Sequence, residues 1–160
     1  MSKKRPIRRP VVAVVDTTFS RFDMGRAAME ELRAFAVRAT RVTVPGIKDL
    51  AVECKRQLDA GADIALALGM VGGADIDRQC AHEASLGIQM AKIATTKHII
   101  EVFVHENEAK NATDLAALFE DRTRKHARNA ARLLLDSDWF TARAGRGLRQ
   151  GRDDVGGLQL

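Results

Sequence analysis

Four short apolar runs alternate along the chain with longer segments in which apolar residues recur at helical spacing. The runs are residues 10–16, 39–44, 63–68 and 98–105. The first of them contains Val11-Val12-Ala13-Val14-Val15, and such a continuous run is typical of a strand buried on both faces of a parallel sheet. Helical periodicity covers residues 23–37, 49–60, 75–95 and 113–135, and a short helix is expected over 137–144.

This alternation of strands and helices predicts an α/β fold with right-handed crossovers. The expected architecture is a flavodoxin-like three-layer sandwich, in which helices cover both faces of a four-stranded parallel sheet. At 160 residues the chain suits one domain with its own core. We expect a basic N-terminal arm over residues 1–10, a single α/β domain over 11–144, and a Gly- and Arg-rich tail over 145–160.

The net charge of +5 comes from the N-terminal arm. Its five cations equal the whole excess of 26 basic over 21 acidic residues, so the rest of the chain is balanced. These cations are Lys3, Lys4, Arg5, Arg8 and Arg9. A basic arm without aromatic residues is more often a solvated tail than a nucleic-acid reader, and we therefore expect no nucleic-acid partner.

The remaining bulk features favour a cytoplasmic protein. No stretch approaches the roughly 18 consecutive apolar residues of a membrane span, and the first residues lack the apolar core of a signal peptide. Cys54 and Cys80 are too few for a disulfide framework and are not spaced as a metal-binding CxxC pair. Both thiols are expected to be reduced, and no membrane partner is expected.

Polar residues gather in the four loops that follow the predicted strands, where α/β proteins bind their ligands. The loops are Asp16-Thr17-Thr18-Phe19, Pro45-Gly46-Ile47-Lys48-Asp49, Gly69-Met70-Val71-Gly72-Gly73 and His105-Glu106-Asn107-Glu108. Together they offer an aromatic ring, hydroxyls, a Lys beside an Asp, flexible backbone amides and a His beside a Glu. This set favours a flat polar heterocycle carrying hydroxyl groups as the ligand.

Several of these residues also have a structural interpretation. Residues 16–18 could equally cap the first helix, and Phe19 could equally belong to the core. The glycines after the third strand lack the Lys-Ser or Lys-Thr of a P-loop, and no GxGxxG fingerprint is present, so a phosphate cradle there has weak support. We expect His98 to be structural and His126 to be solvated on a basic helix face.

His82 lies in a helical segment rich in small residues, Cys80-Ala81-His82-Glu83-Ala84-Ser85-Leu86-Gly87. Small side chains permit close packing of another helix or of a second subunit. His82 with Glu83 has two interpretations, a proton-handling pair or an interface hydrogen bond, and the sequence leaves both open.

Six segments together resemble the archaeal-type riboflavin synthases, a branch of the lumazine synthase superfamily. They are Asp16–Arg21, Val44–Leu50, Ala67–Met70, Cys80–Gly87, Lys97–Ala109 and Gly145–Gly151. The resemblance implies a homopentamer with active sites between neighbouring subunits. It implies that two molecules of 6,7-dimethyl-8-ribityllumazine react at each site, one giving a four-carbon unit to the other. The products are riboflavin and 5-amino-6-(ribitylamino)uracil, and no cofactor is expected, although the sequence leaves open whether a divalent ion such as Mg²⁺ assists.

The resemblance also suggests roles for particular residues. His105 or His82 is the candidate acid/base, oriented by Glu106 or Glu83. Removal of a proton from the lumazine 7-methyl group gives an anion, which a donor such as Lys48 would stabilise. Asp49 matches the carboxylate that binds ribityl hydroxyls. Phe19 lies near the ring-stacking position, although Phe22 is an alternative. The expected substrate-binding residues are Thr17, Thr18, Phe19, Pro45, Gly46, Ile47, Asp49, Gly69, Met70, Val71, Glu106 and Arg149, the last reaching a neighbour's site.

Three other functions are alternatives to the one that this resemblance implies. Lumazine synthases usually carry an Arg and a catalytic His after the third strand, whereas Val71–Gln79 contains no His and only Arg78. The cations Arg122, Arg124, Lys125 and Arg128 nevertheless keep a phosphate site open for that enzyme. A receiver domain would need an Asp at the end of the third strand, where Leu68-Gly69-Met70 stands instead. A nucleic-acid-binding module would rest on the arm alone.

Overall fold

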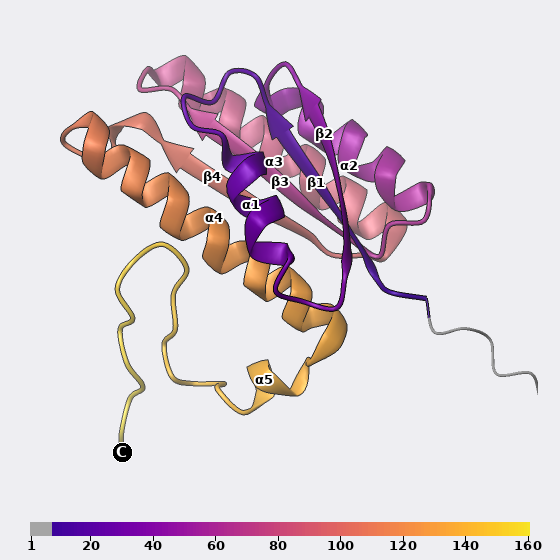
Figure 1. Ribbon diagram of the computed structural model, residues 1–160. Helices are drawn as coiled ribbons and strands as arrows, with labels where there is room; N and C mark the ends of the chain where they lie inside the picture. The colour runs from indigo at the N-terminus through magenta and orange to yellow at the C-terminus, as the bar shows by residue number, and fades with distance from the viewer. Residues whose placement is uncertain (1–7) are drawn as a thin grey trace, which may run out of the picture.

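A four-stranded parallel sheet forms the centre of the molecule (Figure 1). The computed structural model describes residues 8–160, and the strand order is β2-β1-β3-β4. The strands are β1 (Val11–Thr17), β2 (Arg38–Val44), β3 (Ile64–Val71) and β4 (Ile99–His105). All the pairings are parallel, in the order typical of flavodoxin-like folds. The predicted α/β fold and its four strands are therefore confirmed.

Helices cover both faces of this sheet (Figure 1). One face carries α1 (Met24–Leu32) and α4 (Ala112–Leu135), and the other carries α2 (Leu50–Asp59) and α3 (Asp75–Thr95). The short elements are η1 (Ile47–Asp49), η2 (Glu106–Glu108) and α5 (Asp138–Thr141). Met24 and Phe119 belong to the core between the sheet and α1 and α4, whereas Leu50 and Ile88 belong to the core on the opposite face.

Strand β3 is longer than the sequence predicts. It continues past Leu68 to Val71 because its last three residues pair with the last three residues of β4. Gly69 lies in this extension, and a Cβ there would lie only 2.5 Å from Cγ2 of Ile47. Glycine therefore allows the turn before α2 to pack directly on the strand. Residues 69–71 belong to the sheet, and the expected flexible loop begins only after Val71.

Helix α1 is shorter than predicted and ends at Leu32, because the chain must turn to bring Arg38 beside Val11 in the sheet. Asp23 caps its start by accepting the Arg26 N–H at 2.9 Å. The alternative in which residues 16–18 cap this helix is therefore wrong. At the start of α4, Asn111 is the cap.

Helices α2 and α3 approach each other closely. A Cβ on Gly87 would lie 3.2 Å from the Cβ of Ala51, so the small residues of α3 do permit the close packing expected of them. The partner that they pack against is a helix of the same subunit.

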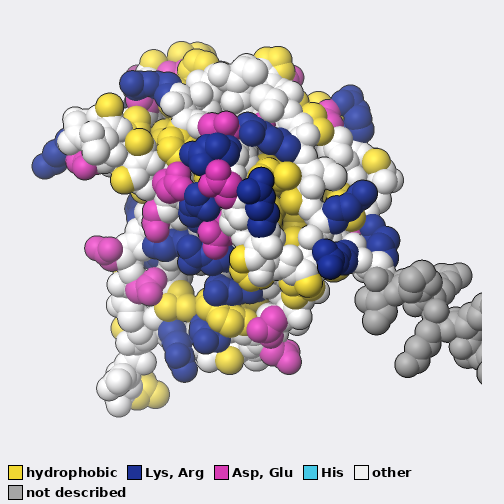
Figure 2. Space-filling view, in the orientation of Figure 1, with side chains coloured by type: hydrophobic (Ala, Val, Ile, Leu, Met, Phe, Trp, Pro, Cys, Tyr) yellow, Lys and Arg dark blue, Asp and Glu magenta, His cyan; other side chains and the backbone are white. Residues whose placement is uncertain are grey.

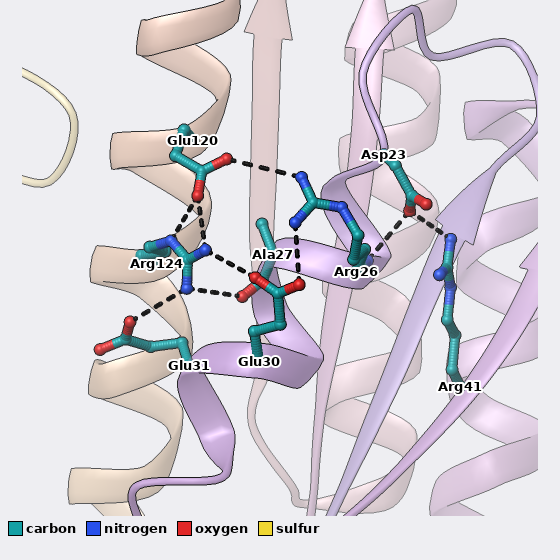
Figure 3. A network of polar contacts seen from close by, with 8 residues as sticks. All are labelled: Asp23, Arg26, Ala27, Glu30, Glu31, Arg41, Glu120 and Arg124. Atoms are coloured by element: carbon teal, nitrogen blue, oxygen red, sulfur yellow. Dashed lines mark hydrogen bonds and ion pairs between the residues drawn. The ribbon is translucent and has the colours of Figure 1, made fainter.

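A network of charged side chains joins α1 to α4 (Figure 3). Arg124 contacts Glu30 at 2.8 Å and Glu120 at 2.5 Å, and Glu31 lies 3.5 Å away. Hydrogen bonds from Arg124 to Glu30 and Glu120 raise the pKa of its guanidinium. Because these carboxylates already neutralise Arg124, it is not a free cation for the phosphate site considered above.

The start of the described chain and the first part of the tail contact the domain. Arg8 of the basic arm forms an ion pair with Asp63 at 2.8 Å, while Lys3, Lys4 and Arg5 lie outside the described residues. The tail returns beside α4 (Figure 1), where the Gly151 carbonyl accepts a hydrogen bond from Arg122 at 3.4 Å. None of the helices within residues 8–160 has the length and apolar content that a bilayer crossing requires.

Candidate functional site

The N-terminal half of α3 separates two cavities. The first, here called the Phe19 cavity, has a volume of about 240 Å³. Its lining residues are Phe19, Gly46, Ile47, Lys48, Asp49, Met70, Val71, Gly72, Asp77 and Cys80. The second, here called the His105 cavity, has a volume of about 460 Å³. Its lining residues are Arg78, Ala81, His82, Ser85, Glu101, Phe103, His105, Glu108, Arg122, His126, Gln150 and Arg152. The predicted site residues are therefore divided between two sides of one helix.

Phe19 is the aromatic residue that faces the first cavity. Its side chain is 55% exposed, so its assignment to the core is wrong. Phe22 instead stacks on Phe119, with ring centroids 5.6 Å apart and an interplanar angle of 8°. The ring of Phe22 is therefore held by the core, and Phe19 is the ring free to contact a flat ligand.

The turn between β2 and α2 forms the opposite wall of the Phe19 cavity. The Thr18 N–H donates to the Val44 carbonyl at 2.9 Å, and the Thr18 hydroxyl donates to the Pro45 carbonyl at 3.2 Å. Thr18 therefore supports the turn with the hydroxyl that was expected to bind substrate. The carboxylate of Asp49 makes no capping hydrogen bond to α2, although Asp49 occupies the N-cap position. That leaves its oxygens available to hydroxyl groups of a ligand.

Lys48 and Glu83 connect the turn to α3. The Lys48 Nζ lies 2.6 Å from a carboxylate oxygen of Glu83. This contact raises the pKa of Lys48 and lowers the pKa of Glu83, so both groups are charged at neutral pH. Glu83 also accepts from Gln79 at 3.3 Å. In this subunit the partner of Glu83 is Lys48 rather than His82, and the proton-handling pair considered above does not form.

The His105 cavity lies at the free edge of β4, between α3 and α4. His105 is half-buried at the end of β4, and His82 is exposed on α3. Below them Arg122 donates to both carboxylate oxygens of Glu108, at 2.8 and 2.6 Å, and to the Phe103 carbonyl at 2.9 Å. The hydrogen bonds that the Glu108 carboxylate accepts from Arg122 and from the His105 N–H lower the pKa of Glu108 to about 2. They outweigh burial, which acts in the opposite direction.

His126 is a third histidine of this cavity, and the prediction that it is solvated is wrong. It is half-buried on α4, one helical turn after Arg122. Burial, and secondarily the positive charge of Arg122, lower the pKa of His126 to about 4. The ring is therefore neutral at pH 7. The spacing of four residues between Arg122 and His126 was the signal in the sequence that both lie on one face of the helix.

We expect the free energy of unfolding to fall as the pH falls from about 6.5 towards 4. In that window the unfolded chain protonates His126 while the folded chain does not, so the unfolded state binds more protons. A shift of this size corresponds to a loss of up to about 3 kcal/mol. Urea denaturation at a series of pH values measures this loss of stability. The loss is expected to be absent in His126→Gln and retained in the matched control His98→Gln. An equally steep pH dependence in both variants would contradict the assignment.

Other predicted residues lie outside the two cavities. Glu106 forms an ion pair with Arg21 at 2.6 Å, and within residues 8–160 no ion pair joins it to His105. Thr17 is buried and its hydroxyl has no partner within residues 8–160. Arg149 lines a separate hollow beside α4. Residues 8–160 contain no group of three or more His, Cys, Asp and Glu side chains arranged to hold a metal ion.

Comparison with known proteins identifies the family. The model of the 6,7-dimethyl-8-ribityllumazine synthase family matches residues 10–136. The chain belongs to this family. A protein from Methanothermobacter marburgensis named riboflavin synthase is 46% identical over 150 residues, covering 92% of this chain and 98% of that protein. Proteins of the same name from Archaeoglobus fulgidus and Aeropyrum pernix are 42% and 44% identical, over 91% and 92% of this chain and 96% and 97% of theirs.

Because these relatives cover more than nine-tenths of the chain, the similarity extends past the end of the family match at residue 136. It therefore includes α5, which follows α4 in the chain.

Proposed function

We propose that this protein is a riboflavin synthase, which converts two molecules of 6,7-dimethyl-8-ribityllumazine into riboflavin and 5-amino-6-(ribitylamino)uracil. The observation that carries the proposal is the 42–46% identity, over nearly the whole chain, to relatives named riboflavin synthase. The Phe19 cavity supports it with an exposed aromatic ring beside a carboxylate, which suits a flat ring with a hydroxylated chain. The transfer moves a four-carbon unit between identical molecules, so it needs no external oxidant or reductant.

The alternative, a lumazine synthase that uses a four-carbon phosphate, has less support. Only Gly72-Gly73-Ala74 connect β3 to α3, so no His lies in that connection. The four cations that kept a phosphate site open are all paired with acidic side chains: Arg122 with Glu108, Arg124 with Glu30 and Glu120, Lys125 with Asp121, and Arg128 with Glu31.

We further propose a homopentamer with active sites between subunits. The candidate acid/base histidines and the candidate ring-binding residues lie on opposite sides of α3, so they do not converge within one subunit. In a closed ring of five subunits, the Phe19 cavity of one subunit can face the His105 cavity of the next, which would bring the histidines and the ring-binding residues together. Leu86, Met90 and Ile93 form an apolar stripe along α3 and are 52–79% exposed, as expected of a surface covered by another subunit.

In this arrangement a base removes a proton from the methyl group at position 7 of one lumazine. His105 or His82 is the candidate for that step. The resulting carbanion is delocalised into the ring, and the Lys48 ammonium stabilises it. Holding two lumazines against each other supplies proximity, which contributes much of the acceleration. We propose a cytoplasmic location and no nucleic-acid partner. No cofactor enters these steps.

Incubation of the purified protein with 6,7-dimethyl-8-ribityllumazine alone tests the function. We expect riboflavin to form, with one ribitylaminouracil released for each riboflavin, as followed by chromatography with fluorescence detection. Addition of Mg²⁺ or of a chelator measures any dependence on a divalent ion. If no riboflavin forms, and lumazine is made instead from ribitylaminouracil and the four-carbon phosphate, the proposal is wrong.

Lys48→Met is expected to lower kcat by roughly 10- to 100-fold, with a smaller change in KM. This is less than the loss typical of a donor in an enclosed site, because Lys48 is exposed and already paired with Glu83. Lys55→Met is the matched control, since Lys55 is a partly exposed lysine of α2 that pairs with Asp59 and lines neither cavity. Equal kcat values for the two variants would remove Lys48 from the mechanism.

Native mass spectrometry tests the assembly. We expect a particle five times the mass of the 17.5 kDa chain. Met90→Asp introduces a charge into the apolar stripe, where Met90 is 71% exposed in the single subunit, and is expected to dissociate the particle. A monomeric wild-type protein that is fully active would exclude sites shared between subunits.

A further inference from the structure

A third cavity, here called the Trp139 cavity, lies where α4 ends and the tail returns. It has a volume of about 200 Å³, and its charged lining residues are Lys125, Arg128, Arg132, Arg149 and Asp154. Figure 2 shows Lys and Arg side chains gathered, with hydrophobic surface between them, in the lower part of the face on which α4 ends and α5 follows. None of the residues lining the Trp139 cavity also lines the Phe19 cavity, and Gln150 alone also lines the His105 cavity.

Trp139 of α5 holds two guanidinium groups in place. The Arg132 guanidinium lies 3.9 Å from the centroid of the indole and the Arg143 guanidinium 4.2 Å from it. These cation–π contacts orient both arginines without neutralising them, because the indole carries no net charge. Two cations share one ring, so the indole is not available for stacking against a ligand.

The cavity has an excess of positive charge. Four cations line it against one carboxylate, and Asp154 is engaged by the Arg149 N–H at 2.8 Å. Arg128 is paired with Glu31 and Lys125 with Asp121, whereas no ion pair joins Arg132 or Arg149 to an acidic side chain within residues 8–160. Burial, followed by the charges of Arg128 and Arg143, lowers the pKa of Arg132. A bound anion would offset this excess of positive charge around Arg132.

We propose that the Trp139 cavity binds a phosphate group, either as free phosphate or as the terminal group of a small phosphoester. Guanidinium groups match the oxygens of phosphate in a bidentate geometry, and Arg132 is the central contact. A volume of about 200 Å³ is below the roughly 300–1,000 Å³ of sites that enclose a whole drug-sized ligand. Because two guanidinium groups already lie over the indole, it is not free to stack on a nucleobase or flavin ring. The site therefore takes a small anion, separate from the lumazine site.

Trp139 is the single tryptophan of the chain, so its fluorescence reports directly on this cavity. Titration of the full-length protein with inorganic phosphate, and separately with glycerol 3-phosphate, is expected to change the fluorescence with saturation. Chloride at matched ionic strength is expected to give no saturable change. Saturation by either phosphate compound supports the site, and the tighter one identifies the source. An identical response to chloride would mean that only charge screening is observed, and would overturn the proposal.

Arg132→Gln tests the assigned contact. It is expected to weaken phosphate binding at least tenfold by isothermal titration calorimetry, and Lys110→Gln, which removes one exposed cation elsewhere, is expected to bind as wild type. Thermal denaturation without phosphate checks that both variants are folded. Lumazine turnover of Arg132→Gln is expected to stay within about twofold of wild type. Unchanged phosphate affinity, or a loss of turnover parallel to the loss of phosphate binding, would overturn a separate site at Arg132.

Discussion

His105→Ala is expected to lower kcat for riboflavin formation by about 10²–10⁴-fold, while KM changes little. His105 is half-buried at the end of an edge strand and lines the larger of the two site cavities. Its backbone N–H donates to Glu108, which Arg122 holds in turn. A group that transfers a proton only in the transition state affects kcat rather than ground-state binding. Steady-state kinetics with 6,7-dimethyl-8-ribityllumazine measure both constants.

His82→Ala is expected to differ from His105→Ala, because only one of the two removes the proton. His98→Ala is the matched control, since His98 is exposed next to the start of the same strand, and it should retain wild-type kcat. A large loss of kcat in His82→Ala, without one in His105→Ala, would make His82 the residue that removes the proton. If neither variant slows turnover by more than about tenfold, proximity dominates the catalysis and both assignments fail.

Arg122→Met is expected to destabilise the protein by about 3–5 kcal/mol, because it leaves the Glu108 carboxylate partly buried without its partner. Arg122 is 7% exposed and also supports two backbone carbonyls, those of Phe103 and Gly151. For a chain of this length the loss corresponds to a melting temperature lower by roughly 6–20 °C. The tail loses its contact at Gly151, so Gln150 and Arg152 should no longer close the cavity.

Two further variants separate the charge effect from packing. Arg122→Met combined with Glu108→Gln is expected to recover part of the lost stability, since no unpaired carboxylate remains. Arg152 also lies near Glu108, at 3.7 Å, but its side chain is 67% exposed. Arg152→Met should therefore cost less than about 1 kcal/mol. A similar small loss for Arg122→Met would show that the buried pair does not hold the tail.

Most of the fold could be predicted from the sequence, because burial along an element leaves a local pattern. The apolar run that forms β1 is buried throughout, and helix α3 spans the predicted residues 75–95. The errors occur where long-range pairing determines an end. Strand β3 continues to Val71 through its pairing with β4, and α1 stops early to allow the pairing of β2 with β1.

The sequence by itself determined the layered fold, the family and the residue types available for chemistry, since periodicity and motif residues are local properties of the chain. Only the tertiary structure decided how these residues are divided. It turned Glu83 towards Lys48, 35 residues away, and placed His126 under the burial and charge that keep it neutral. It also placed the ring-binding residues and the histidines on opposite sides of α3. These outcomes depend on how α3 and α4 are rotated when they pack on the sheet, which spacing along one helix does not specify.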